Sequence, residues 1–372
     1  MNVPLLDLKA QHRAIRDAMV PRILELAESQ QFILGTPVQE LEQRVAELSH
    51  ARFGVGVASG TDALLVPLKA LDLKPGDEVI TTPFTFFATA GAIHNAGGKP
   101  VFVDVERDTW NIDPAAVEAA ITPRTRAIMP VHLFGQMAAM ERLLPLAERH
   151  GVTLVEDAAQ AIGARRKVGG QWRMAGELGA VTGFSFFPSK NLGGWGDGGM
   201  IVANDQAMAD RVRSLRTHGG ARQYYHDEIG INSRLDALQA VVLLAKLPYL
   251  ESWSAARRAN AARYGQALAS LSAVCTPVTD PANQHIFHQY VIECDRRDEL
   301  QAHLKAKEIG CAVYYPLALH LQPCFRYLGY REGAFPVAEA ATRRVLALPV
   351  YPELTEAQQQ YVADTIRGFY GQ

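Results

Sequence analysis

Residues 185–199 read Ser185-Phe-Phe-Pro-Ser-Lys190-Asn-Leu-Gly-Gly-Trp-Gly-Asp-Gly-Gly199. The run from Val181 to Phe187 is apolar and is typical of a buried strand. Lys190 follows this strand at the start of a loop that contains five glycines, so it is placed to point into a cleft. A lysine beside such a loop is more often a solvated surface residue. A catalytic role for Lys190 therefore requires support from a second residue elsewhere in the chain.

A carboxylate at the end of a second strand supplies that partner. The run from Thr153 is apolar and ends in Asp157, where a plain turn or helix-cap residue is the alternative interpretation. Ligands in open α/β sheets bind outside the carboxyl ends of the strands, so we expect Lys190 and Asp157 to share one cleft. A lysine that forms a Schiff base and an aspartate that keeps a pyridine nitrogen protonated together indicate pyridoxal phosphate chemistry.

A third segment fits the phosphate of such a cofactor. A short β-rich run from Phe53 turns through Ser59-Gly60-Thr61 into a helical pattern. The first turn of that helix offers free backbone N–H groups and the positive end of the helix dipole, and the two hydroxyls add donors. The glycine spacing is one residue off the dinucleotide fingerprint, and no Gly-Lys-Ser/Thr follows, so Rossmann and P-loop interpretations are weak. An ordinary capped helix remains the alternative.

Three phenylalanines follow the next strand, in the run Thr82-Pro-Phe84-Thr-Phe86-Phe87. Closely spaced phenylalanines are more often core residues than a platform for a ligand. A flat cofactor ring nevertheless needs an aromatic face, so one of the three is a candidate.

The pattern from residue 53 to residue 204 alternates short β-rich runs with helical runs, which predicts a mainly parallel sheet with helices on both faces. Before it, residues 37–49 form a predicted helix, with Thr36 as its cap and Gln39 completing a capping box. Ser233 is expected to open a long helix.

The length of 372 residues favours one large and one smaller domain over a single core. The predicted long helix extends past Leu250, and shorter strands and helices typical of an α+β cap follow residue 270. We therefore predict a cofactor-binding domain over residues 1–245 and a small C-terminal domain over residues 246–372.

Composition excludes several classes of protein. The hydrophobic content of 48% with 20% charged residues is ordinary for a globular protein, and a net charge of −2 gives no reason to expect a nucleic-acid partner. No run approaches the length of a membrane span, and the amino terminus lacks a secretory pattern. The four cysteines form no C-x-x-C, so neither a zinc site nor redox pairing is expected, and we predict a cytoplasmic protein.

Several segments occur together in a known family. They are Gly60-Thr-Asp-Ala-Leu64, Thr85-Phe86, Glu156-Asp-Ala-Ala-Gln160, Ser185-Phe-Phe-Pro-Ser-Lys-Asn191 and Gly230-Ile-Asn-Ser-Arg-Leu-Asp236. In this order and spacing the chain resembles the DegT/StrS-type sugar aminotransferases, a branch of the fold-type I pyridoxal phosphate enzymes. The resemblance extends over nearly the whole chain. It implies a large α/β domain, in which helices sandwich a mainly parallel mixed sheet, and a smaller α+β C-terminal domain.

The resemblance implies roles for individual residues. Lys190 resembles the Schiff-base lysine and proton shuttle, and Asp157 matches the partner of the pyridine nitrogen. The other cofactor contacts that it implies are Gln160 near the phenolic oxygen, Phe86 stacked on the ring, and Gly60, Thr61 and Ser185 on the phosphate.

Further residues are implied outside this cofactor set. Asn232 matches a residue that reaches the phosphate from a neighbouring subunit, so the resemblance implies a homodimer with shared active sites. Arg234 matches a substrate contact, and the segment with Tyr314, Tyr315 and His320 resembles the part of the family that lies near the sugar.

The implied activity is transfer of an amino group, with glutamate as donor, through pyridoxamine phosphate to a nucleotide-linked keto-sugar. The product would be an amino sugar for surface polysaccharide or natural-product glycosylation, and two half-reactions at one site imply ping-pong kinetics. Pro67 and the pair Gly194-Trp195 depart from the common family pattern and bear only on the sugar pocket. The sugar, the nucleotide and the choice between C3 and C4 stay open.

Three alternatives remain at this point. A related class dehydrates the sugar and has a histidine in place of the Schiff-base lysine, which Lys190 argues against. Other pyridoxal phosphate reactions on the same fold find no support in the Gly60–Leu64 and Asn232–Asp236 segments. A non-catalytic, sugar-sensing regulator would be expected to lose Lys190 or Asp157. An absorption spectrum of the purified protein separates the catalytic interpretations from the regulator.

Overall fold

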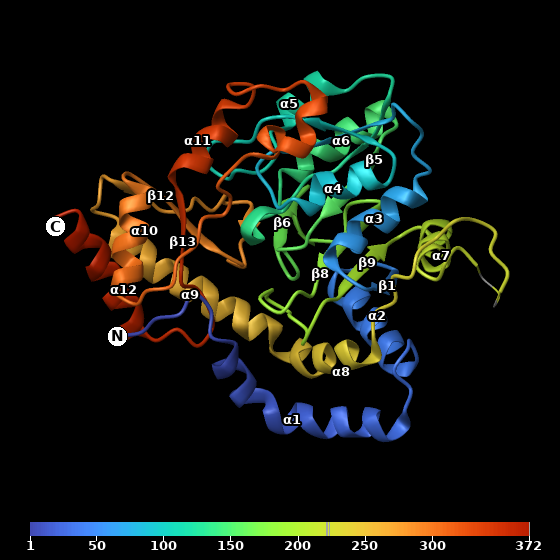
Figure 1. Ribbon diagram of the computed structural model, residues 1–372, viewed down its shortest axis with the longest axis horizontal. Helices are drawn as coiled ribbons and strands as arrows, with labels where there is room; N and C mark the ends of the chain where they lie inside the picture. Colours follow the sequence, from blue (N-terminus) through green and yellow to red (C-terminus); the bar gives the residue numbers. More distant parts are fainter. Residues whose placement is uncertain (221, 223, 372) are drawn as a thin grey trace.

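The computed structural model of the chain describes residues 1–220, 222 and 224–371 (Figure 1). Its centre is a seven-stranded sheet in the order β1-β9-β8-β5-β4-β2-β3. Its strands are β1 (Phe53–Val57), β2 (Glu78–Thr81), β3 (Lys99–Phe102), β4 (Thr125–Ile128), β5 (Thr153–Asp157), β8 (Val181–Ser185) and β9 (Gly199–Ala203). Neighbours from β8 to β3 pair in parallel, and β9 runs antiparallel to both β1 and β8. The predicted mainly parallel sheet is confirmed.

Helices cover both faces of this sheet. On one face a core cluster packs four helices, α2 (Thr36–Leu48), α5 (Pro114–Ala120), α6 (Met140–His150) and α8 (Ala237–Lys246). On the other face a second cluster packs α3 (Gly60–Ala70), α4 (Ala88–Asn95) and α7 (Gln206–Leu215). The strands between them are buried on both sides, which explains their continuous apolar runs.

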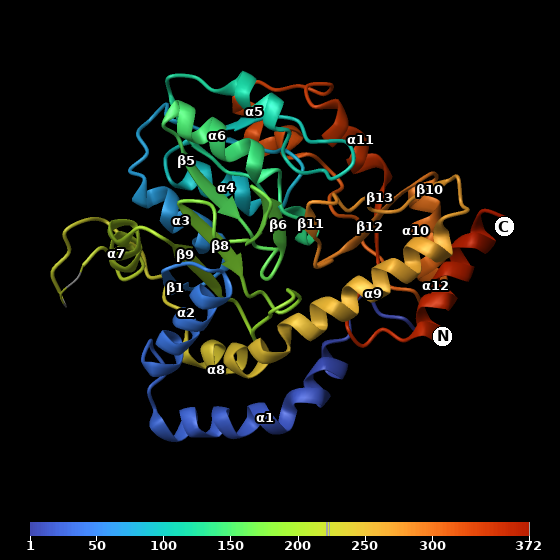
Figure 2. The same cartoon turned by 180° about the vertical axis from the view of Figure 1, so that it is seen from behind.

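The first helix, α1 (Leu8–Ser29), lies along α8, as both Figure 1 and Figure 2 show. Its buried Ile15 and Met19 pack with Val242 of α8 and with Trp253. Within the described residues, no helix combines the length and apolar character needed to cross a membrane.

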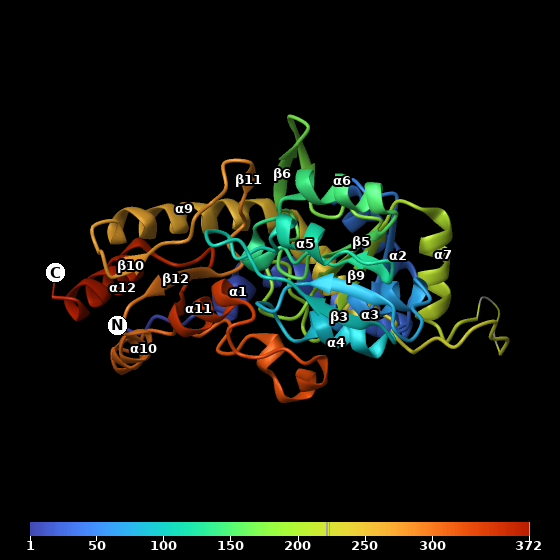
Figure 3. The ribbon, with the colours of Figure 1, turned by 90° about the horizontal axis from the view of Figure 1, so that it is seen from above.

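The C-terminal part builds a second, smaller layer of sheet and helix. Its three-stranded sheet has the order β10-β12-β13 and packs against three helices. These elements are β10 (Val274–Cys275), β12 (Tyr290–Cys294), β13 (Val345–Leu348), α9 (Leu250–Leu268), α10 (Arg297–Ala306) and α12 (Glu356–Phe369). Figure 3 shows α9 running from the central sheet into this smaller part.

The remaining elements include a third, three-stranded sheet in the order β11-β6-β7. They are β6 (Arg165–Val168), β7 (Gln171–Met174), β11 (Asn283–Gln284), α11 (Pro336–Arg344) and the 3-10 turns Leu133–Gly135, Leu247–Tyr249, Leu319–Leu321 and Pro323–Leu328. Val3, close to the amino terminus, packs into the C-terminal core and pairs with Ile309. The domain division between residues 245 and 246 stays a prediction, and Gln372 of the small domain lies outside the described residues.

Two local predictions are wrong. Helix α2 has Gly35 at its N-cap with a φ of 83°, so Thr36 is already helical and no side chain caps the helix. Ser233 does not open a helix, because α8 begins only after the N-cap Asp236. The Ser233 hydroxyl instead donates to the Asp62 carboxylate at 2.8 Å, in the first turn of α3.

Candidate active site

The carboxyl ends of the parallel strands meet at one cavity of about 430 Å³. Strand β5 ends at Asp157, β8 ends at Ser185, and the chain turns from β1 into α3 at Ser59. Of the residues singled out in the sequence, those that line this cavity are Gly60, Thr61, Phe86, Asp157, Gln160, Ser185, Lys190, Tyr314 and Tyr315. The sheet topology therefore brings Lys190 and Asp157 into one cleft, as the strand-end argument predicts.

Lys190 is partly buried at the cavity, and its backbone N–H donates to the Phe187 carbonyl at 2.8 Å. Burial lowers the pKa of its amine to about 8, although the negative charge of Asp157 opposes this shift. A larger share of this amine is therefore uncharged near neutral pH than for a surface lysine. An uncharged amine is the form that attacks a carbonyl carbon.

Asp157 is held by two hydrogen bonds. Its Oδ2 accepts from the Thr89 hydroxyl at 2.7 Å, and its Oδ1 accepts from the Ala159 N–H at 3.2 Å. Burial raises the pKa of the carboxyl group, while these bonds and the charge of Lys190 favour the carboxylate. A positively charged group bound in the cavity would further stabilise the ionised form of Asp157.

The start of α3 forms the opposite end of the cavity. Ser59 is the N-cap, and its hydroxyl accepts from the Asp62 N–H at 3.1 Å. A Cβ on Gly60 would lie 2.5 Å from the Cβ of Ser185, so only glycine allows α3 to approach β8 this closely. Free N–H groups of a first helical turn beside two hydroxyl-bearing residues suit an anion such as phosphate.

The three neighbouring phenylalanines occupy different environments. Phe84 is fully buried in the core, and Phe87 packs on Phe325 with 5.7 Å between ring centroids. Phe86 is 58% exposed and lines the cavity. It is therefore the phenylalanine of this run whose ring is free to meet a flat ligand.

Gln160 and Tyr315 form a connected pair at the cavity wall. The Gln160 Oε1 accepts from the Phe134 N–H at 2.7 Å, so its Nε2 is the end that donates to the Tyr315 hydroxyl, at 3.0 Å. The ring of Tyr315 stacks on that of Phe134. Burial raises the pKa of the Tyr315 and Tyr314 hydroxyls, so both stay neutral phenols.

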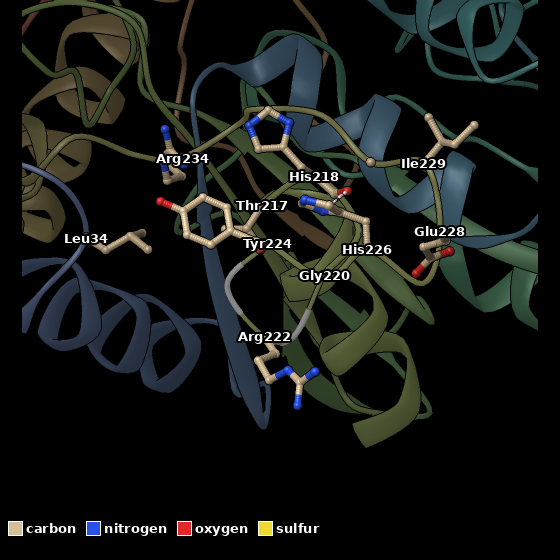
Figure 4. Close-up of a pocket in the computed structure, with 11 residues that line it drawn as sticks. Leu34, Thr217, His218, Gly220, Arg222, Tyr224, His226, Glu228, Ile229 and Arg234 are labelled. Atoms are coloured by element: carbon tan, nitrogen blue, oxygen red, sulfur yellow. Dashed lines mark hydrogen bonds between the residues drawn. The ribbon is translucent and has the colours of Figure 1, made fainter.

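Three residues from the sequence analysis lie away from this cavity. Asn232 is exposed, and Arg234 borders a different surface pocket together with His218 and Tyr224 (Figure 4). His320 is 1% exposed, and its Nε2 lies 3.0 Å from a Glu339 carboxylate oxygen, so its ring faces away from solvent and cavity.

Ser59, whose hydroxyl the sequence analysis includes in the phosphate cradle, also lines the cavity. Several other lining residues received no role from the sequence, namely Leu64, Thr85, Ala88, Val131, Ala159, Phe187, Ser189, Asp197, His288 and Gln289. Ser189 is next to Lys190 in the chain, and this proximity alone could have found it. Thr89 and His288 carry no local signal, because one lies in an Ala-rich helix and the other in a segment far along the chain.

The donor set fits pyridoxal phosphate. An amine of lowered pKa, a buried carboxylate, an anion cradle and an exposed aromatic face surround one cavity of about 430 Å³. The amine suits the cofactor's aldehyde, the carboxylate its ring nitrogen, the anion cradle its phosphate and the aromatic side chain its ring face.

Comparison with known proteins leads to the same chemistry. The sequence model of the DegT/DnrJ/EryC1/StrS aminotransferase family matches residues 13–367. The chain is 51% identical, over 100% of its length and 99% of the relative, to a protein of Geobacillus stearothermophilus described as a pleiotropic regulatory protein. It is 45% identical, over 98% of its length and 97% of the relative, to the UDP-N-acetyl-3-dehydro-alpha-D-glucosamine 3-aminotransferase of Acidithiobacillus ferrooxidans.

Among solved structures, the chain is similar to DesV of Streptomyces venezuelae in complex with a ketimine intermediate. The TM-score is 0.96 at 42% identity, over 100% of this chain and 99% of DesV. This similarity confirms the predicted fold, with its large α/β domain and mainly parallel mixed sheet.

Proposed function

Because the chain belongs to the DegT/DnrJ/EryC1/StrS aminotransferase family, we propose that its acceptor is a UDP-linked keto-hexose aminated at C3, with glutamate as the amino donor. The protein is a pyridoxal phosphate-dependent aminotransferase of nucleotide sugars. The observation that carries the chemistry is the meeting of Lys190 and Asp157 in one cavity. The C3 position and the uracil nucleotide rest on the Acidithiobacillus relative.

We assign roles to the cofactor-facing residues on their geometry. Pyridoxal phosphate, when bound, supplies an aldehyde that condenses with amines and a ring that delocalises the electrons of a broken C–H bond. Lys190 would hold the cofactor through its Nζ and, when that amine is free, would carry a proton there. Asp157, oriented by the hydrogen bond from Thr89, would supply a negative charge to the ring nitrogen of the cofactor.

The other contacts orient the cofactor and the sugar. The start of α3 at Gly60 and Thr61, with Ser185, takes the phosphate, and Phe86 supports the ring face. Gln160 would donate to the phenolic oxygen of the cofactor, and the neutral hydroxyls of Tyr314 and Tyr315 would offer hydrogen bonds to the sugar. His320 is left out of this proposal, because its imidazole is buried against Glu339.

We also propose a homodimer in which each subunit completes the other's site. Ser233 is fully buried, and its hydroxyl donates to Asp62 in the first turn of α3 of its own chain. Its neighbour Asn232 is exposed, and Arg234 borders the surface pocket of Figure 4, so both side chains are accessible to a second subunit. Exposed aromatic rings of Phe86 and Phe187 at the cavity add apolar surface that a second copy would cover.

Complementation tests this shared site. Mixing a Lys190→Ala protomer with an Asn232→Ala protomer is expected to restore activity to part of the population. One site of each heterodimer then keeps both residues, because the interface of a two-fold dimer is isologous. Activity is measured on affinity-purified heterodimers that carry a different tag on each protomer.

The matched control pairs Lys190→Ala with Asp157→Asn, two residues of the same cavity on the same chain. Each site of that heterodimer carries one of the two changes, because both residues come from the same chain, so we expect no restored activity and its signal gives the background of the assay. No restored activity in the Lys190→Ala/Asn232→Ala heterodimer relative to either homodimer, or full activity of a proven monomer, would refute the shared site.

A regulator is the second candidate, because the relative from Geobacillus stearothermophilus is described as a regulatory protein. Both Lys190 and Asp157 are present and share the cavity, which favours catalysis. Lys190 likewise argues against a sugar dehydratase of the same family. We place the enzyme in the cytoplasm, which the four free thiols support.

A panel of keto-sugar nucleotides tests the proposed acceptor. The holoenzyme is given glutamate and, in separate reactions, UDP-3-keto, UDP-4-keto and dTDP-3-keto hexoses, and amino-sugar products are measured by mass spectrometry. We expect the UDP-3-keto sugar to have the highest kcat/KM. Faster amination of a 4-keto sugar would overturn the C3 assignment, and faster turnover of the dTDP sugar would overturn the nucleotide.

A further inference from the structure

His288 lines the same cavity and is absent from the roles assigned above. It lies between β11 and β12 and is 5% exposed. Its backbone N–H donates to the Phe134 carbonyl at 2.8 Å, and its carbonyl accepts from the Arg257 guanidinium at 3.3 Å. These two bonds fix the backbone from which the imidazole of His288 extends.

The hydrogen bonds of Asn191 define the tautomer of this imidazole. The Asn191 Nδ2 donates to the Ile286 carbonyl at 3.3 Å, so the Oδ1 is the atom that lies 3.1 Å from the His288 Nδ1. An amide oxygen only accepts, so the His288 Nδ1 carries the hydrogen. The Nε2 of a neutral imidazole in this tautomer is a hydrogen-bond acceptor.

The surroundings keep the ring neutral. Burial, together with the positive charges of Lys190 and Arg257, lowers the pKa of His288 well below its usual value. Within the described part of the chain, no group donates to the Nε2 atom. The cavity wall thus presents a permanent acceptor whose donor must come from the cavity.

We propose that His288 is a positioning residue for Lys190: its Nε2 accepts a hydrogen bond from the lysine amine whenever that amine is not bonded to the cofactor. Lys190 precedes the asparagine that fixes the His288 tautomer, and both residues line the cavity. Among the described residues, the amine of Lys190 is influenced by burial and by the charge of Asp157, with no side-chain hydrogen bond. The bond would aim the amine for its proton transfers, so this inference rests on the proposed function.

Two substitutions separate the two ring nitrogens. In His288→Asn, the side-chain amide reaches about as far as Nδ1, so it can keep the bond to Asn191 but loses the acceptor in the cavity. In His288→Gln, the amide reaches about as far as Nε2, so the acceptor is kept and the bond to Asn191 is lost. Thermal melting of both variants as holoenzymes monitors folding.

The readout is the rate at which Lys190 re-forms its covalent link when pyridoxal phosphate is added back to resolved apoenzyme, followed by visible absorbance across a pH series. For His288→Asn we expect the plateau rate at high pH to fall about tenfold, the order expected from the loss of one positioning hydrogen bond. The midpoint of the curve of rate against pH should also move to lower pH. A hydrogen-bond acceptor stabilises the charged amine, so removing the acceptor lowers the pKa of Lys190. His288→Gln should stay near the wild-type profile.

An unchanged profile in His288→Asn would overturn the proposal, as would a His288→Gln profile altered as much as that of His288→Asn. A purely structural role would lower the melting temperature without shifting the midpoint. This measurement needs no sugar substrate. If the wild type re-forms the link between Lys190 and the cofactor but aminates no sugar, the proposed function is wrong. The comparison of the two His288 variants then still tests the role of His288.

Discussion

Replacing Lys190 by alanine is expected to abolish the visible absorption of lysine-bound cofactor and to reduce amino transfer by roughly 10⁴-fold or more, the upper range for a lost acid–base group. The amine of Lys190 is the one whose pKa is lowered to about 8 at the wall of the cavity. Alanine offers neither a nucleophile for the aldehyde nor a carrier for the proton. Borohydride reduction followed by peptide mapping measures the covalent link.

The chain contains its own control for this experiment. Lys246 is also buried, with a pKa lowered to about 8, but it lies outside the cavity and its amine donates to the Gly193 carbonyl. If burial alone made a lysine reactive, reduction would also label Lys246. We expect the label only on the Lys190 peptide of the wild type. Borohydride-reducible cofactor retained by Lys190→Ala would contradict the assignment.

Replacing Asp157 by asparagine is expected to slow both half-reactions on the order of 10²- to 10³-fold, the cost typical of removing one preorganised electrostatic partner. Asparagine keeps the shape of the side chain and can still accept the hydrogen bond from Thr89. It cannot stabilise a protonated ring nitrogen, since it carries no charge. The rates of the donor and acceptor half-reactions are measured separately by rapid mixing.

Thr89→Val is a milder variant that tests the same role of Asp157. It removes the bond to the Asp157 Oδ2 but leaves the carboxylate and the Ala159 N–H in place. The rate should therefore fall by less than in Asp157→Asn, with the cofactor still bound. Turnover of Asp157→Asn comparable to wild type, at full cofactor occupancy, would be incompatible with the role of Asp157.

The parts of the site that sequence could predict lie next to one another in the chain or at strand ends. Asp157 and Lys190 follow apolar strands, and strand ends in a parallel sheet meet at one edge. Gly60 and Thr61 follow β1 directly and open α3. In each case a local pattern fixes the secondary structure, and the sheet topology then fixes the meeting point.

The parts that sequence could not predict depend on distant contacts. Thr89 orients Asp157 across 68 residues, and His288 contacts Asn191 across 97 residues. Ser233 looked like a helix cap, but its hydroxyl is taken by Asp62 on another element. The N-cap of α2 is Gly35 and not Thr36, because the positive φ of Gly35 sets the start of the helix. A side-chain pattern carries no signal of this backbone conformation.

The most direct test of the central claim is the absorption spectrum of the purified holoenzyme through one full cycle. We predict that glutamate alone removes the visible band of lysine-bound cofactor. A UDP-linked 3-keto sugar should then restore the band while one equivalent of amino sugar appears by mass spectrometry. A visible band that glutamate leaves unchanged, or that no keto-sugar nucleotide restores after its loss, would contradict a sugar aminotransferase and favour the sensing role.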